Sequence, residues 1–223
     1  SVPTADTLFL LILSILALES AHSIRFLYQH FLSGITEKSL NVFLCVDDTM
    51  VSKFGTKFEN VSKLFDHAAH NGSNYLNGHC FVSVMLCVPV WNRDKVSYLS
   101  VPLGYRMWQK KESKLELAAS MIRQVMPEFH SKDHVIILCD SWYTKQNLVS
   151  IVDEYPNLDL IGNARIDSVM YDLAPAQTGR RGRPAKHGKH LSVETDFTFS
   201  NEKIGDYYTG VRRVLAKIFG NRE

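Results

Sequence analysis

Two aspartate-containing strings in this chain each follow a short apolar run, and both have the chemistry to bind a divalent cation. Asp47 and Asp48 come directly after residues 42–46, and Asp140 comes directly after residues 135–139. Carboxylate oxygens are hard ligands of the kind that Mg²⁺ and Mn²⁺ prefer. Two such carboxylates at neighbouring strand ends can share metal ions. The pattern therefore predicts metal-assisted phosphoryl chemistry.

The elements that must position these aspartates can be predicted from the spacing of apolar residues. Short runs rich in β-branched residues predict buried strands, and apolar residues three and four apart predict an amphipathic helix that Pro127 ends. The expected order is three strands, a helix, a strand, a helix and a strand. These elements cover residues 42–46, 79–90, 95–103, 113–126, 135–139, 144–152 and 158–161.

Three strands close together in sequence suit an antiparallel meander, and alternating helices and strands after them imply a mixed sheet with helices on its faces. The expected fold class is therefore α/β. This order resembles the ribonuclease H-like fold, in which the ends of the first and fourth strands lie next to each other. Asp48 and Asp140 occupy those two ends.

Three regions are expected along the chain: an N-terminal helical segment over 1–41, a ribonuclease H-like core over 42–166, and an insertion region with a basic loop over 167–223, which is incomplete. The N-terminal segment contains the most apolar stretch, residues 8–18. Eleven residues are too few to cross a bilayer, which needs about 20. We therefore interpret this stretch as part of a buried helix over residues 4–32.

The basic loop, residues 177–190, contains five cationic residues, three glycines, one proline and no acid. Such a composition cannot bury a core and predicts a loop. Its Arg-Gly-Arg-Pro string resembles an AT-hook, which lies in the minor groove of A·T tracts. Non-specific phosphate binding is the alternative. The candidate DNA-binding residues are Lys53, Arg180, Arg181, Arg183, Lys186 and Lys189. For Lys53, a solvated surface position stays an equal alternative to phosphate contact.

The net charge and the cysteines say little about a partner but something about the cellular compartment. The chain has 223 residues with a net charge of +2, which is too small to indicate a partner by itself. Its four cysteines lie within apolar strand-like runs, and no two of them have the CxxC spacing of a zinc site. This usage predicts reduced core thiols in a cytosolic protein.

Several strings together resemble the IS4-type DDE transposases. They are Asp47-Asp48-Thr49, Lys53-Phe54-Gly55, Asn77-Gly78-His79, Pro102-Leu103, Cys139-Asp140-Ser141-Trp142-Tyr143, Asn163-Ala164-Arg165 with Asp167-Ser168, and Gly182-Arg183-Pro184 with Lys186. The resemblance implies a bacterial enzyme of the nucleoid that cuts and joins transposon ends with Mg²⁺ or Mn²⁺. Its partners would be the double-stranded DNA of the transposon ends and of the target. A homodimer on DNA is left open.

The resemblance implies that Asp48 is the first catalytic and metal-binding acid, with Asp47 as the runner-up, and that Asp140 is the second. From the residues alone, these aspartates are also compatible with turn or helix caps. Trp142 and Tyr143 either pack on the domain or stack on a flipped base.

The family's third acid is a Glu within a Tyr-x2-Arg-x3-Glu-x6-Lys pattern, and no part of this sequence matches it. We interpret the chain as a transposase truncated at its C-terminus. The alternatives are a catalytically dead DNA-binding remnant or inhibitor, and a nuclease that cuts without joining.

Overall fold

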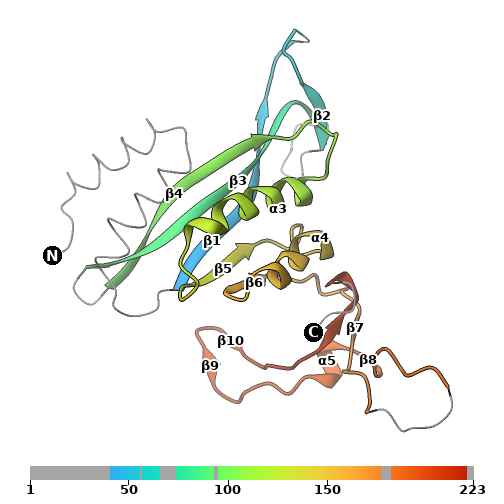
Figure 1. Cartoon of the computed structure of the whole chain (residues 1–223). Coiled ribbons are helices and arrows are strands. Elements are labelled where there is room, and N and C mark those ends of the chain that lie inside the picture. The colour runs from blue at the N-terminus through green and yellow to red at the C-terminus, as the bar shows by residue number, and fades with distance from the viewer. Residues whose placement is uncertain (1–40, 56, 66–73, 93–94, 177–181, 220–223) are drawn as a thin grey trace.

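The computed structural model describes residues 41–55, 57–65, 74–92, 95–176 and 182–219 (Figure 1). The predicted N-terminal helix and the candidate DNA-binding residues Arg180 and Arg181 lie outside these ranges. Within the described ranges, no helix has the length and apolar character needed to span a membrane.

The described residues form one six-stranded mixed sheet that organises the main body of the molecule. Strand β3 pairs antiparallel with β1, β2 and β4, whereas β1 pairs parallel with β5, and β5 pairs parallel with β6. The order is β2-β3-β1-β5-β6, with β4 also on β3. The strands are β1 (Asn41–Ser52), β2 (Ser62–Phe65), β3 (Tyr75–Asn92), β4 (Lys95–Met107), β5 (His134–Cys139) and β6 (Leu158–Gly162).

The predicted mixed α/β sheet is confirmed, and it is compatible with the ribonuclease H-like fold. One part of the prediction is wrong. Strand β1 does not end at Val46, because its ladder with β3 continues as far as the pair Ser52 and Gly78. Asp48 therefore lies inside a long strand and not at its tip.

Close packing at Gly78 holds three strands together at this end of the sheet. Gly78 is paired with Ser52 of β1 on one side and with Ser62 of β2 on the other. A Cβ atom at Gly78 would lie 2.3 Å from the carbonyl oxygen of Val51. Only a residue without a side chain allows this approach.

Helix α3 (Lys114–Val125) covers one face of the sheet and continues into the 3-10 turn η2 (Met126–Glu128). It begins with a capping box, in which the Ser113 hydroxyl accepts from the Glu116 amide and the Glu116 carboxylate accepts from the Ser113 amide. This arrangement satisfies two amides that a helix start leaves unpaired. The predicted helix over 113–126 is confirmed.

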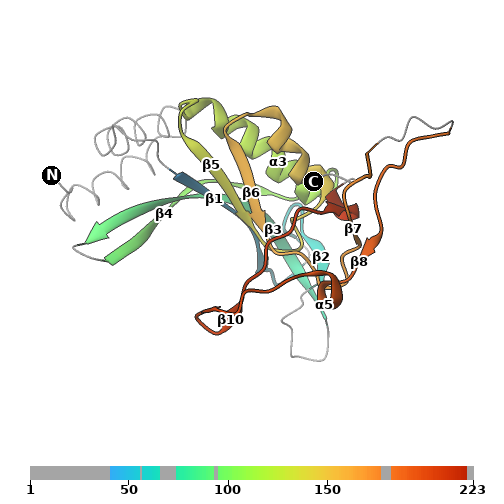
Figure 2. The same cartoon turned by 90° about the horizontal axis from the view of Figure 1, so that it is seen from below.

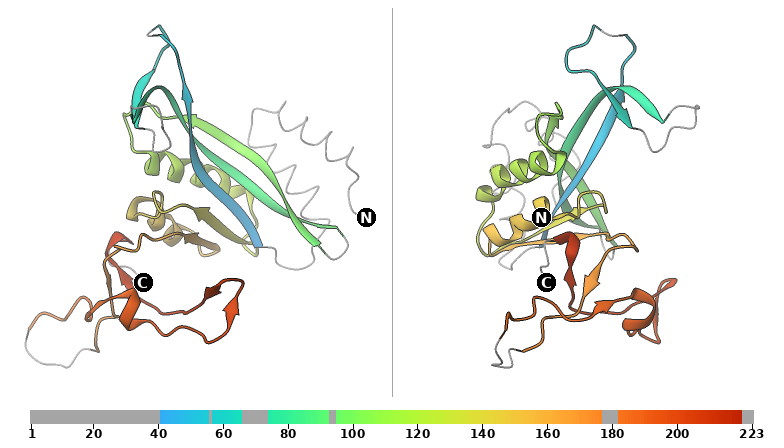
Figure 3. Two further views of the ribbon diagram at one scale, coloured as in Figure 1. Left: turned by 180° about the vertical axis from the view of Figure 1, so that it is seen from behind. Right: turned by 90° about the vertical axis from the view of Figure 1, so that its right-hand side faces the viewer.

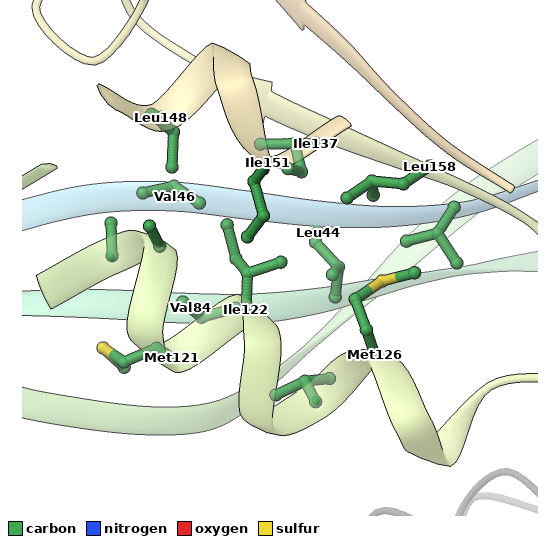
Figure 4. Packing of buried hydrophobic residues seen from close by; sticks show 14 of the residues in the cluster. Leu44, Val46, Val84, Met121, Ile122, Met126, Ile137, Leu148, Ile151 and Leu158 are labelled. Carbon is green, nitrogen blue, oxygen red and sulfur yellow. The ribbon is translucent and has the colours of Figure 1, made fainter. Parts of the chain in front are cut away.

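The core lies between this face of the sheet and the helices (Figure 4). Alternate residues of β1 point into it, and they meet Ile122 of α3 and the segment formed by α4 (Gln146–Val149) and the 3-10 helix η3 (Ser150–Glu154). Fully burying one such aliphatic side chain is worth roughly 1.5–3 kcal/mol. The central buried residues include Val42, Leu44, Val46, Val84, Ile122, Ile137, Leu148, Ile151 and Leu158.

The C-terminal part of the chain forms a smaller layer beyond β6 (Figures 1 and 2). It has a three-stranded sheet in the order β11-β7-β8 and a hairpin of β9 and β10. Arg212 ties the layer together by donating to the Asp172 carboxylate. The elements are β7 (Met170–Tyr171), β8 (His190–Leu191), α5 (Val193–Asp196), β9 (Lys203–Ile204), β10 (Tyr207–Tyr208), β11 (Leu215–Ala216) and the 3-10 helix η4 (Lys217–Phe219).

Candidate active site

The Asp48 carboxylate accepts hydrogen bonds from three side chains that come from three different elements. The ammonium of Lys114 lies 2.7 Å from Oδ2, and the Cys80 thiol donates to the same oxygen at 3.2 Å. The Tyr143 hydroxyl donates to Oδ1 at 3.2 Å. The Asp48 side chain is only 18% exposed, so these contacts replace most of its hydration. A partly buried carboxylate needs such partners to stay ionised.

Lys114 is the first residue of α3, so the capping box at Ser113 fixes where its side chain starts. Its ammonium also lies 5.3 Å from the ring centre of Trp108 and 5.2 Å from that of Trp142. Burial opposes the charged form, but the hydrogen bond and the negative charge of Asp48 outweigh it and raise the pKa of Lys114. Lys114 is therefore a cation at neutral pH.

Cys80 supplies the second contact on the same oxygen. Burial and the hydrogen bond to Asp48 raise the pKa of the Cys80 thiol to about 11. The thiol is therefore protonated at neutral pH and acts as a hydrogen-bond donor. It is not a thiolate that would compete for a metal ion.

Asp140 follows β5 directly and caps the turn that leads to α4. Its Oδ1 accepts from the backbone amides of Trp142 at 3.0 Å and Tyr143 at 3.2 Å. Its carbonyl oxygen accepts from the Thr144 hydroxyl at 2.7 Å. Oδ2 of Asp140 has no hydrogen-bond partner among the residues that the structure describes. One oxygen of this carboxylate thus holds the turn, and the other is available to a ligand.

Tyr143 connects the two aspartates, because its amide donates to Asp140 and its hydroxyl donates to Asp48. The Tyr143 side chain is buried, with 1% of the residue exposed. Burial, and then the negative charge of Asp48, raise its pKa, so the hydroxyl keeps its proton. Val46 of β1 lies beside Cys139 of β5 in the parallel ladder. Both aspartates therefore follow this pair at the same end of the sheet.

The Asp47 side chain does not lie with that of Asp48, and its role as a metal ligand stays a prediction. Successive side chains of a strand point to opposite faces, so Asp47 lies on the face away from α3. It is exposed, and its carboxylate accepts the backbone amide of Asp48 at 2.8 Å.

Asp48 and Asp140 each offer carboxylate oxygens, which are ligands of the kind that Mg²⁺ and Mn²⁺ prefer. The described residues contain no group of three or more potential metal ligands. However, the Lys114 ammonium on Asp48 shows that this carboxylate already binds a positive charge. Mg²⁺ commonly takes only one or two carboxylates and fills its other positions with water and phosphate oxygens.

Four of the candidate DNA-binding residues fall within the described ranges. Arg183 and Lys186 are exposed in the segment between β7 and β8. Gly182 beside them has a φ of 143°, a backbone conformation that favours glycine. Lys189 forms an ion pair with Asp196, and Lys53 lies 5.6 Å from the ring centre of Phe58.

Three residues of the cluster were not predicted as part of the site. They are Lys114, Cys80 and the hydroxyl-donating Tyr143. The capping pattern of Ser113 and Glu116 predicts that Lys114 opens a helix. It does not predict which strand residue that helix start will face.

Comparison with known proteins gives one match. A family model described as a DDE superfamily endonuclease matches residues 19–205 of the chain. Neither the curated proteins nor the solved structures contain a match to it.

Proposed function

Because the chain belongs to the DDE superfamily of endonucleases, we propose that it is an IS4-type transposase that cuts DNA by divalent-metal-assisted phosphoryl transfer. Asp48 and Asp140 are its two metal-binding carboxylates. The observation that carries this proposal is their position at one end of the parallel β1–β5 pair, connected by Tyr143. Carboxylates held by strands and by a buried tyrosine keep their geometry without reorganisation.

Each side chain of the cluster has a distinct part in this proposal. Asp48 and the free oxygen of Asp140 hold the cation. Tyr143 orients Asp48 through its hydroxyl and positions Asp140 through its amide. When bound, divalent metal activates the attacking oxygen and stabilises the leaving oxygen of the phosphodiester. Residues 42–166 form the catalytic core in this proposal, and residues 167–223 form the insertion region.

The test is nicking of supercoiled plasmid DNA with Mg²⁺ or Mn²⁺. Asp48→Asn and Asp140→Asn should each abolish nicking and weaken Mn²⁺ binding, while the circular dichroism spectrum stays that of the parent protein. Asp47→Asn is the matched control, because it removes the neighbouring charge on the opposite face. Equal activity and equal Mn²⁺ affinity in all three variants would exclude the assigned site.

A second function is favoured by one observation. The described residues contain no group of three or more potential metal ligands, and Asp48 already forms an ion pair with Lys114. This arrangement suits a protein that binds transposon DNA without cutting it, such as an inhibitor of an active transposase. DNA binding without metal-dependent nicking would support this second function. Nicking that is followed by a joined product would support the transposase.

A further inference from the structure

An arm of the sheet extends beyond the helices (Figure 1). We define the β1–β2 arm as residues 51–55, 57–65 and 74–79, which lie at one end of the molecule (Figures 1 and 3). Strand β1 carries Asp48 and runs directly into this arm. A ligand on the arm would therefore lie next to the strand that carries the first acid.

One face of the β1–β2 arm presents a row of basic and polar residues from three adjacent chain segments. The Lys53 amide donates to the Asn77 carbonyl at 2.8 Å, and Lys63 of β2 pairs with Asn77 from the other side. Side chains alternate along a strand, so the next residue of β2, Leu64, points to the opposite face. Leu64 is 4% exposed, so its side chain is buried on that opposite face.

Aromatic rings lie on the same face as these lysines. Phe65 and Tyr75 face each other across the strands with ring centres 5.3 Å apart, and they are 44% and 50% exposed. The Lys63 ammonium lies 4.5 Å from the ring centre of Tyr75. In the adjoining loop, Lys53 lies over Phe58, which is 50% exposed. Three half-exposed rings therefore lie beside two lysines on this arm.

The charge of the β1–β2 arm and its aromatic rings together indicate which kind of ligand it binds. Among the described residues of the arm, three lysines stand against one acid, Glu59, so a negative partner is favoured. Flat aromatic rings interleaved with cations bind nucleic acid by stacking on bases while the cations contact phosphates. In a duplex the base faces are already stacked on one another, whereas a single strand leaves them open.

We propose that the β1–β2 arm binds single-stranded DNA, with Phe65 and Tyr75 stacking on bases and Lys53 and Lys63 contacting phosphates. The choice of DNA over RNA rests on the proposed function. Tyr75 and Asn77 are an odd number of residues from Cys80 along β3, so the bound strand would lie on the face of the sheet opposite to the Asp48 cluster.

The experiment is a binding titration by fluorescence anisotropy, in EDTA, with a labelled oligothymidine about 15 nucleotides long. The double variant Phe65→Ala/Tyr75→Ala should bind about tenfold more weakly or worse, since stacking on one ring is worth about a factor of ten or more. Lys53→Ala/Lys63→Ala should flatten the slope of log K against log salt by about 0.7 for each phosphate that the variant no longer neutralises.

The matched control is Lys203→Ala/Tyr208→Ala, which removes a similar exposed stack with the ammonium 5.1 Å from the ring. This control should bind the oligonucleotide as the parent protein does. Equal losses in the two aromatic variants would overturn the proposal, and so would a loss of duplex binding by Phe65→Ala/Tyr75→Ala as large as its loss of single-strand binding. A parent protein that dimerises through the arm, with the Phe65/Tyr75 variant monomeric in sedimentation, would also overturn it.

Because the binding titration is run in EDTA, its result is independent of the metal-dependent nicking that tests the proposed function. Cutting needs the metal, but stacking does not. Asp48→Asn should therefore bind the oligonucleotide like the parent protein even though it does not nick DNA. A parent protein that binds the single strand but does not nick DNA would contradict the proposed nuclease and not the arm. A parent protein that nicks DNA but does not bind the single strand would contradict only the arm.

Discussion

The ammonium nitrogen of Lys114 lies 2.7 Å from Oδ2 of Asp48, and both side chains are largely shielded from water. The same carboxylate is the first metal ligand in the proposed mechanism. Any divalent ion that binds there must therefore displace a cation that the chain itself supplies. The metal affinity of the site is the difference between these two interactions.

Replacement of Lys114 by methionine should raise the affinity for Mn²⁺ by roughly tenfold, because the competing charge is removed while the side-chain volume is kept. The metal-free variant should lose about 2 kcal/mol of unfolding free energy, the scale of one hydrogen bond between charged groups. Calorimetric titration with Mn²⁺ and urea unfolding measure the two effects.

Lys145→Met is the matched control for this substitution. The Lys145 ammonium lies 4.4 Å from the ring centre of Trp142 but has no contact with Asp48 among the described residues. It should leave Mn²⁺ binding unchanged. Weaker Mn²⁺ binding by Lys114→Met would show that Lys114 supports the site and does not compete for it.

The Tyr143 hydroxyl should contribute stability separately from the Tyr143 ring. Tyr143→Phe keeps the packing and removes the bond to Asp48, so we expect a loss of about 1 kcal/mol. Tyr143→Ala also leaves a cavity and should cost about 3–5 kcal/mol. Urea unfolding of both variants checks this order. No loss in Tyr143→Phe would mean that the hydroxyl contributes nothing, and equal losses in the two variants would mean that the ring contributes nothing beyond the hydroxyl.

The basic loop should govern the response of duplex binding to salt. Replacing Arg180, Arg181 and Arg183 with alanine should lower the slope of log K against log salt by up to about 3, at about 0.9 for each phosphate contact. Titration of an A·T-rich duplex at several salt concentrations measures the slope. The control replaces three exposed lysines outside the loop: Lys111, Lys132 and Lys217. An unaltered slope in the arginine variant would exclude the loop as the main contact.

The C-terminal layer should lose stability in acid. The hydrogen bonds from Lys189 and from the Ser192 amide lower the pKa of Asp196 from 3.8 to about 2. A lowered folded-state pKa gives stability that is present above the unfolded value and is lost as the pH falls from about 4 towards 2. Amide exchange at Ser192 should accelerate over that window. Asp196→Asn should remove this pH dependence, whereas Glu194→Gln on the same helical turn should keep it.

Local pattern was sufficient to predict several elements of the fold. The helix over 113–126 and the strands over 135–139 and 158–161 were predicted within one or two residues, because periodicity, capping and Pro127 are local signals. The end of β1 was wrong, because its last six residues are held by pairing with β3 about 30 residues away. Such pairing is set by the partner strand and not by the run itself.

In the candidate site, too, the local features were predicted from the sequence and the long-range contacts were not. The apolar runs predicted which aspartates follow buried strands, and the structure gives them a common partner in Tyr143. The contacts of Asp48 with Cys80 and Lys114 join residues 32 and 66 positions apart. They depend on strand register and on where α3 crosses the sheet, and a local sequence motif determines neither of these. The position of Asp47 on the opposite face from Asp48 follows from strand alternation once β1 is known to continue past it.

The tryptophans beside Lys114 give the protein an internal optical signal. The sequence has three tryptophans, and the rings of two of them, Trp108 and Trp142, lie within about 5.3 Å of the same ammonium. The emission of an indole ring shifts in wavelength and intensity when a charge beside it moves. Displacement of Lys114 by a divalent ion would therefore change the fluorescence of the unlabelled protein, and occupancy of the site could be followed in real time without DNA.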